Sequence, residues 1–191
     1  GEFASIIGSS GSGKSTLLKI LGGLLLPTTG NVLLDGQDIY AMNAEQLAQV
    51  RRQKIGFIFQ DFRLFPEYTV RDNILLPLLL DKREPDEEYL ALLTRQLGLT
   101  ALLQRQPTQL SGGQQQRAAL ARILVGKPSI LMLDEPFSAL DSYLREEVEG
   151  EVGSLLANFV GTALLVTHNR DEAYRLCKEM IVLNEGQVLR A

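Results

Sequence analysis

The sequence predicts an α/β fold in which a mainly parallel sheet is flanked by helices. Short apolar runs of strand length alternate along the chain with segments of helical periodicity, and this alternation is typical of parallel sheets covered on both faces. A loop rich in glycine and serine separates the first expected strand from the first expected helix. Residues 61–115 lack strand-like runs and predict a separate helical subdomain.

The first part of the chain predicts a strand, a loop and a helix in immediate succession. Residues 3–7 are mostly apolar and end at Gly8, which indicates a buried strand. Residues 14–25 carry leucines at helical spacing, and the turn residues at 27–30 end that helix. The next expected elements are a strand at 31–34, a helix at 44–52 and a strand at 55–59.

The second part of the chain begins with helices and returns to strands. Residues 70–105 predict helices with a break at Pro85 and Asp86, and residues 113–125 predict another helix that ends near Gly126. The remaining expected elements are strands at 129–133 and 162–167, a charged helix between them at 143–159, and a closing hairpin formed by 180–183 and 187–189.

Composition indicates one globular domain and excludes several classes of protein. The chain has 191 residues, of which 45% are apolar, and its net charge of −4 gives no basic surface for nucleic acid. Cys177 is the only cysteine and cannot form an internal disulfide, which favours a reducing compartment. The densest apolar stretch, residues 74–80, is interrupted by Pro77 and is too short to cross a bilayer. A role at a membrane would therefore require a membrane-spanning partner.

The loop after the first expected strand has the spacing of a P-loop, in which backbone N–H groups surround the phosphates of a nucleoside triphosphate. Gly8, Gly13, Lys14 and Ser15 occupy the defining positions. We expect Lys14 to reach the β- and γ-phosphates and the Ser15 hydroxyl to coordinate Mg²⁺. The alternative is a glycine-serine turn before a helix, which the four matched positions oppose. The predicted nucleotide-binding residues here are Gly8, Ser9, Ser10, Gly11, Ser12, Gly13, Lys14, Ser15 and Thr16.

Two carboxylates follow the apolar run at residues 130–133. We expect the strand to bring Asp134 to the mouth of the site, where it can hold Mg²⁺ through water. Glu135, the next residue, is placed to polarise an attacking water. A carboxylate pair at the end of a strand is often only a turn, but the P-loop earlier in the chain favours the catalytic interpretation.

Residues 110–114 read Leu-Ser-Gly-Gly-Gln and precede a predicted helix. Such a helix N-terminus offers exposed N–H donors and a hydroxyl, and so a second anion-binding site, although an ordinary capped helix has the same form. With the P-loop and the two carboxylates, this run resembles the ATP-binding cassette (ABC) family of transport ATPases over nearly the whole chain. The residues concerned are Ser111, Gly112, Gly113 and Gln114.

The resemblance implies roles that the residues alone leave open. Gln60, after the strand at 55–59, would contact Mg²⁺ and the attacking water, whereas a glutamine there is otherwise a solvated loop residue. His168, the only histidine, would be the switch histidine that contacts the γ-phosphate. Asp141 would line a dimer interface and start the next helix. The implied catalytic residues are Lys14, Gln60, Glu135 and His168, and the implied metal ligands are Ser15, Gln60 and Asp134.

The same resemblance implies an ATP hydrolase that uses ATP and Mg²⁺. In the family, two cassettes form a head-to-tail dimer in which Ser111 and its neighbours would serve the ATP of the partner chain. The implied partners are a second copy of the chain, integral membrane permease subunits and, for an importer, a substrate-binding protein. Nucleic acid is not among them. The implied location is the cytoplasmic face of the cell membrane, where the chain would be peripheral.

The subtype is mixed. Residues 106–109, 137–141 and 167–173 resemble bacterial importers of the molybdate and sulfate type. Residues 51–57 and 73–78 resemble lipoprotein-release and macrolide-export cassettes. We favour import. The alternatives are an exporter or lipoprotein-release ATPase, a soluble ABC ATPase of DNA repair or translation, and a nucleotide-binding regulator without turnover.

Two further features concern the expected domain and its partner. ABC cassettes usually carry an adenine-stacking aromatic residue well before the P-loop, but only seven residues precede Gly8 here. We therefore expect residues 1–191 to be a single, N-terminally trimmed ABC ATPase domain. Phe62, Phe65 and Tyr68 could line a groove for a helix of a membrane partner or could pack within the helical subdomain.

Overall fold

The computed structural model describes residues 2–59, 62–138, 149–150, 153–154, 156 and 159–190. The chain divides into two compact units. The first consists of Gly1–Phe57, Ser129–Glu135 and Val160–Ala191, and the second of Ile58–Pro128 and Pro136–Phe159. Most of the expected helix at 143–159 lies outside the described residues.

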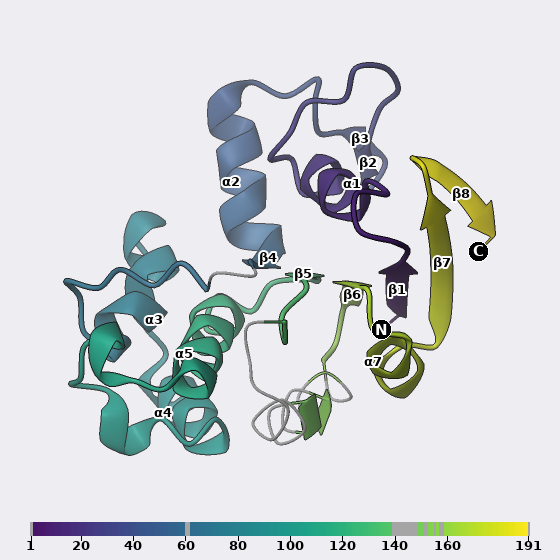
Figure 1. Ribbon diagram of the computed structural model, residues 1–191. Coiled ribbons are helices and arrows are strands. Elements are labelled where there is room, and N and C mark those ends of the chain that lie inside the picture. The colour runs from purple at the N-terminus through teal and green to yellow at the C-terminus, as the bar shows by residue number, and fades with distance from the viewer. Residues whose placement is uncertain are drawn as a thin grey trace. The chain divides into compact units, whose positions relative to one another are not determined.

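The first unit is built on a mainly parallel sheet, as the alternating pattern predicts (Figure 1). Its strand order among the described residues is β4-β5-β6-β1-β7-β8. β1 pairs in parallel with β6 and β7, β5 pairs in parallel with β6, and β8 runs antiparallel to β7. The strands are β1 Phe3–Ile7, β4 Ile55–Ile58, β5 Ile130–Asp134, β6 Thr162–Thr167, β7 Glu179–Asn184 and β8 Gln187–Arg190.

Helices cover both faces of this sheet. Figure 1 shows α1 (Lys14–Leu21) and α2 (Ala44–Lys54) on one face and α7 (Arg170–Leu176) on the other. A small hairpin of β2 (Leu33–Leu34) and β3 (Gln37–Asp38) lies between α1 and α2 in the chain. The fold is therefore the flanked sheet that the sequence predicts.

The prediction for the first helix was wrong at its end, because α1 stops at Leu21 and not at residue 25. Gly22 and Gly23 follow it, and Gly23 has a φ of +68°, which ends the helix. A Cβ at Gly22 would lie 2.9 Å from the Met132 sulfur and 3.0 Å from a Phe57 ring carbon, so a side chain there would require these neighbours to shift. The sequence analysis also missed α7 and β3.

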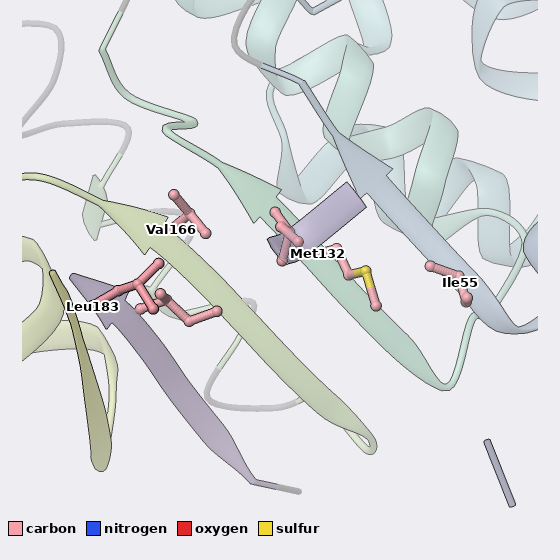
Figure 2. Close-up of a cluster of buried hydrophobic side chains, with 6 residues drawn as sticks. Ile55, Met132, Val166 and Leu183 are labelled. Atoms are coloured by element: carbon pink, nitrogen blue, oxygen red, sulfur yellow. The ribbon is translucent and has the colours of Figure 1, made fainter. Parts of the chain in front are cut away.

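An apolar cluster fixes α1 against the middle of the sheet (Figure 2). Leu18 of α1 is fully buried and meets residues contributed by five strands. Burying a side chain of this size stabilises the fold by about 1.5–3 kcal/mol. The helix that follows the P-loop is thus held firmly in place. The cluster consists of Ile6, Leu18, Ile55, Met132, Val166 and Leu183.

The second unit is helical in its described part. Two of its helices, α3 (Val70–Leu80) and α5 (Gly112–Leu124), pack on each other. Each of these two helices begins with a capping box. No helix in the part of the chain that the structure describes combines the length and apolar character needed to span a membrane. The elements are α3 Val70–Leu80, α4 Glu87–Gln96, η1 Thr100–Leu102, η2 Pro107–Gln109 and α5 Gly112–Leu124.

Candidate functional site

The register of the parallel strands brings three of the predicted site segments to one edge of the sheet. Ile7, the last residue of β1, lies opposite Thr167, the last residue of β6. Asp134, the last residue of β5, lies opposite Val166. The P-loop, the two carboxylates and His168 all follow these strand ends. Ligands of parallel α/β sheets bind at this carboxyl edge.

Close backbone contacts explain the glycine at the start of the P-loop. A Cβ at Gly8 would lie only 2.1 Å from the Leu183 carbonyl oxygen and 2.8 Å from the Ser12 hydroxyl oxygen, so no side chain fits. Gly13, just before α1, has a φ of +97°, which L-residues rarely adopt. The Gly186 N–H donates to the Ser12 carbonyl at 3.0 Å. The turn of the β7–β8 hairpin therefore holds the P-loop through this hydrogen bond.

The P-loop is suited to an anion. Lys14 is buried, and its ammonium donates to the carbonyls of Gly8 at 3.0 Å and Ser9 at 2.9 Å. No ion pair within the described residues includes Lys14, so its charge has no protein counterion there. The Ser12 hydroxyl oxygen is buried without a hydrogen-bond partner. The first N–H groups of α1 add further donors, and this chemistry fits the phosphates of a nucleotide.

Ser15 and Asp134 form a pair of oxygen ligands at the same edge. The Ser15 hydroxyl donates to the Asp134 carboxylate at 2.7 Å, across 119 positions of sequence. Within the described ranges no three His, Cys, Asp or Glu side chains form a ready-made metal site. Mg²⁺ is usually held by one or two protein oxygens together with substrate phosphates. The Ser15–Asp134 pair fits a Mg²⁺ ion bound in this way.

Glu135 and His168 meet directly beside this pair. The Nδ1 atom of His168 lies 3.1 Å from a carboxylate oxygen of Glu135. Glu135 has a φ of +46°, in the left-handed region, and its N–H donates to the Val166 carbonyl at 2.9 Å. Strained backbone of this kind is concentrated at functional sites, where the surrounding structure maintains it. The geometry turns the carboxylate toward the histidine.

The segment around residues 111–114 lies in the second unit, at the N-terminus of α5. The Ser111 hydroxyl accepts from the Gln114 N–H at 3.4 Å, and the Gln114 side-chain oxygen accepts from the Ser111 N–H at 3.0 Å. Ser111 and Gly112 are exposed, whereas Gly113 is buried. The expected helix cap is therefore present, and its first residues face solvent. Gln60 and Asp141 lie outside the described residues.

Sequence reasoning missed the residues that hold the turn around His168. Glu172 is buried, and its carboxylate accepts from the Thr167 hydroxyl at 2.5 Å and from the Asn169 amide at 3.3 Å. The run from Thr167 to Ala173 appeared in the sequence only as a mark of subtype. An acidic side chain in the first turn of a short helix gave no sign that it would be buried.

Comparison with known proteins identifies the family. A family model described as ABC transporter matches residues 1–138. The sulfate/thiosulfate import ATP-binding protein CysA of Thermosynechococcus vestitus is 43% identical over 190 residues, which cover 98% of this chain and 55% of that protein. The lipoprotein-releasing system ATP-binding protein LolD of Shewanella frigidimarina is 40% identical over 182 residues, which cover 94% of this chain and 76% of that protein.

Solved structures of ATP-binding cassettes also match the fold of this chain. A dimeric post-hydrolysis structure of the ATP-binding cassette MJ0796, bound to ADP and Pi, is 40% identical, with a TM-score of 0.86 over 99% of this chain and 84% of that chain. This chain spans about half the length of CysA and of several other curated relatives that it matches. The family model, the fold and the converging P-loop and carboxylates lead to one conclusion: the chain belongs to the ABC transporter family and forms its ATPase domain.

Proposed function

We propose that this chain hydrolyses ATP to drive solute transport through partner membrane subunits, at the cytoplasmic face of the cell membrane. The observation that carries the proposal is the meeting of two polar pairs at one sheet edge. Ser15 contacts Asp134 at 2.7 Å, and His168 contacts Glu135 at 3.1 Å. Residues 1–191 would act as one ABC ATPase domain, with residues 61–115 as its helical subdomain.

The P-loop supplies substrate binding in this proposal. Its N–H groups and the Lys14 ammonium would hold the β- and γ-phosphates of ATP. Ser15 and Asp134, with Gln60, would hold Mg²⁺, which when bound neutralises charge on the phosphate oxygens. The uncompensated charge of buried Lys14 and the unpartnered Ser12 hydroxyl both support an anionic ligand in this loop.

Glu135 supplies the base. Its carboxylate would take a proton from water as the water oxygen bonds to the γ-phosphorus, and the bond from that phosphorus to the bridging oxygen breaks to release ADP and phosphate. His168 would orient Glu135 and contact the γ-phosphate. The direct contact between the two side chains supports this division of roles.

A second copy would complete each site. The exposed helix N-terminus at Ser111, Gly112, Gly113 and Gln114, with Asp141, would contact the ATP bound by the partner. The dimeric state of MJ0796 supports this assembly for a chain of the same fold. Permease subunits would bind the dimer, and an importer would also use a substrate-binding protein.

Import is the direction that we favour, and a lipoprotein-release or export role is the second candidate. Relatives with import in their names support the first, and the match to LolD supports the second. The molybdate and sulfate subtype stays a proposal. Inside-out vesicles that carry the chain with its permease decide the direction, because their outer surface is the cytoplasmic face. ATP added outside should drive solute into the vesicles for an exporter and out of them for an importer.

Phosphate release from ATP tests the activity itself. The purified chain should release phosphate with Mg²⁺ present, and chelation of Mg²⁺ should abolish the release. Lys14→Ala should also abolish it, because the phosphates lose their charged partner. Lys19, a half-buried lysine in the last turn of the same helix, provides the matched control, since Lys19→Ala leaves the loop intact. Equal activity of the Lys14→Ala variant and the native chain would refute the proposed site.

A further inference from the structure

Glu172 is a buried carboxylate that the proposed chemistry does not use. It is 5% exposed, and no ion pair of the described residues includes it. Burying an unpaired charge is costly unless hydrogen bonds satisfy it. Its two donors are the hydroxyl of Thr167 and the side-chain amide of Asn169. These are the two neighbours of His168 in the chain.

The hydrogen bonds form a closed arrangement around the histidine. The Thr167 hydroxyl has one proton, which it donates to Glu172 at 2.5 Å, and its lone pairs accept from the Asn169 N–H at 3.0 Å. The Asn169 side chain also caps α7 by accepting from the Asp171 N–H at 2.9 Å. The backbone on both sides of His168 is therefore fixed through one buried carboxylate.

His168 has little else to orient it. Its side chain is 59% exposed, and its described polar contact is the one with Glu135. Thr167, in contrast, is buried at the end of β6 opposite Ile7. The ring direction must therefore come chiefly from the flanking backbone, which the Glu172 network fixes.

We propose that Glu172 is a positioning residue that holds His168 in contact with Glu135. This inference rests on the proposed ATP hydrolysis for its consequence in catalysis. The orientation of His168 by Glu172 does not depend on ATP hydrolysis, because the hydrogen bonds around His168 form without nucleotide. A displacement of about 1 Å in a catalytic group can lower a rate by about 100-fold, so a residue outside the reacting groups can control turnover.

The single histidine makes the structural part directly measurable. One imidazole Cε1–H signal is expected in the NMR spectrum, because the chain contains one histidine. Glu172→Ala should shift this signal toward the position of a freely rotating ring, and Thr167→Val should shift it in the same direction. Glu172→Gln keeps one acceptor for the Thr167 hydroxyl and should leave the signal close to that of the native chain. An unchanged ring signal in Glu172→Ala would overturn the proposal.

Kinetics test the consequence. Glu172→Ala should lower kcat by about 10- to 100-fold, while the Kd for ATP stays within about twofold because the P-loop is intact. Glu172→Gln should recover most of the rate. Thr94→Val is the control, since it removes a buried hydroxyl that bonds to the Leu90 carbonyl in the second unit. Equal losses of kcat in the control and in Glu172→Ala would show general destabilisation and refute positioning.

The two proposals fail differently. If the native chain releases no phosphate from ATP, the proposed function is wrong, but the ring signal still decides whether Glu172 orients His168. If the native chain is active and Glu172→Ala moves the ring without lowering kcat, positioning by Glu172 has no role in turnover and this inference is wrong. If Glu172→Ala does not fold, Thr167→Val supplies both measurements.

Discussion

Glu135 adopts a left-handed backbone that costs free energy and is held by the Val166 carbonyl on one side and His168 on the other. A glutamine in this place keeps the shape but cannot accept a proton from water. We expect Glu135→Gln to lower the rate of ATP hydrolysis by about 10²- to 10⁴-fold, the usual loss when a general base is removed. Steady-state phosphate release measures the rate.

The same variant should still bind ATP, because the P-loop residues are unchanged. A fluorescent ATP analogue provides this second measurement. Glu179→Gln, an exposed carboxylate on β7, is the matched control and should retain the native rate. A Glu135→Gln chain that hydrolyses ATP at the native rate would assign the base to another residue.

Cys177 gives a pH-dependent prediction in the same unit. Burial raises the pKa of its thiol to about 11, while a hydrogen bond with Ser5 opposes this shift. The neutral thiol is therefore favoured in the fold. Its contribution to stability is complete below the unfolded pKa of about 9 and is lost as the pH rises through about 11. At pH 8 the thiolate fraction is about 100-fold lower than in the unfolded chain.

Iodoacetamide tests this directly, because only the thiolate reacts. The added mass on the single cysteine should appear slowly at pH 8 in the folded chain and much faster in urea. The folded rate should rise steadily as the pH approaches 11. Equal alkylation rates for folded and unfolded chain at pH 8 would contradict a raised pKa.

At the scale of elements, α5 anchors the loop that follows residue 61. The Arg122 guanidinium donates to the Phe62 carbonyl at 2.8 Å and to the Arg63 carbonyl at 2.7 Å. Both of these residues have positive φ values, 53° and 47°. Burial lowers the pKa of Arg122, yet a guanidinium stays charged at neutral pH. One side chain therefore holds two strained residues.

We expect Arg122→Ala to lower the free energy of unfolding by about 1.5–3 kcal/mol, the usual contribution of hydrogen bonds to a charged group. Arg122→Lys should recover only part of it, because an ammonium lacks the planar fork. Arg83→Ala is the control: this exposed arginine makes one longer bond, 3.4 Å, to the Gly126 carbonyl. Urea unfolding measures the free energy of unfolding of all three variants. Equal losses at both positions would show that Arg122 has no special role.

The elements also show where sequence patterns succeed. Residues 162–167 were predicted as a strand and form β6, because a run of apolar and β-branched residues that is mostly buried is typical of a strand inside a parallel sheet. The first helix was predicted too long, because Leu24 and Leu25 continue its periodicity although both are exposed. α7 was missed, because a seven-residue helix held by an Asn cap has too few turns for a period.

The residues of the candidate site could be predicted from sequence motifs, but the contacts between these residues could not. Glycine, lysine and carboxylate positions follow local patterns that phosphate chemistry requires. The contact of Ser15 with Asp134 spans 119 positions and depends on strand order, which no local pattern encodes. The burial of Glu172 depends on packing of α7 on β1 and β6 and could not be predicted from the sequence.

At the scale of the whole molecule, the proposed dimer predicts complementation. Lys14→Ala damages the P-loop, and Ser111→Arg blocks the helix N-terminus that would contact the partner's ATP. Each variant alone has two damaged sites. A mixture should form heterodimers with one doubly damaged site and one intact site, so phosphate release should rise above that of either variant alone. Sedimentation with ATP measures dimer formation, and no gain in activity despite heterodimers would count against shared sites.

The central position of β1 has a consequence for synthesis on the ribosome. The P-loop leaves the exit tunnel before the strands that flank it in the sheet, because Phe3 pairs with Ala163 and Ala4 pairs with Glu179. The Gly186 N–H that closes on Ser12 is translated later still. Until these partners have emerged, the nascent chain therefore carries the P-loop sequence without the strands and the hairpin that complete its site. ATP can therefore stabilise the domain only once the β7–β8 hairpin has emerged, because a ligand stabilises only the state that binds it.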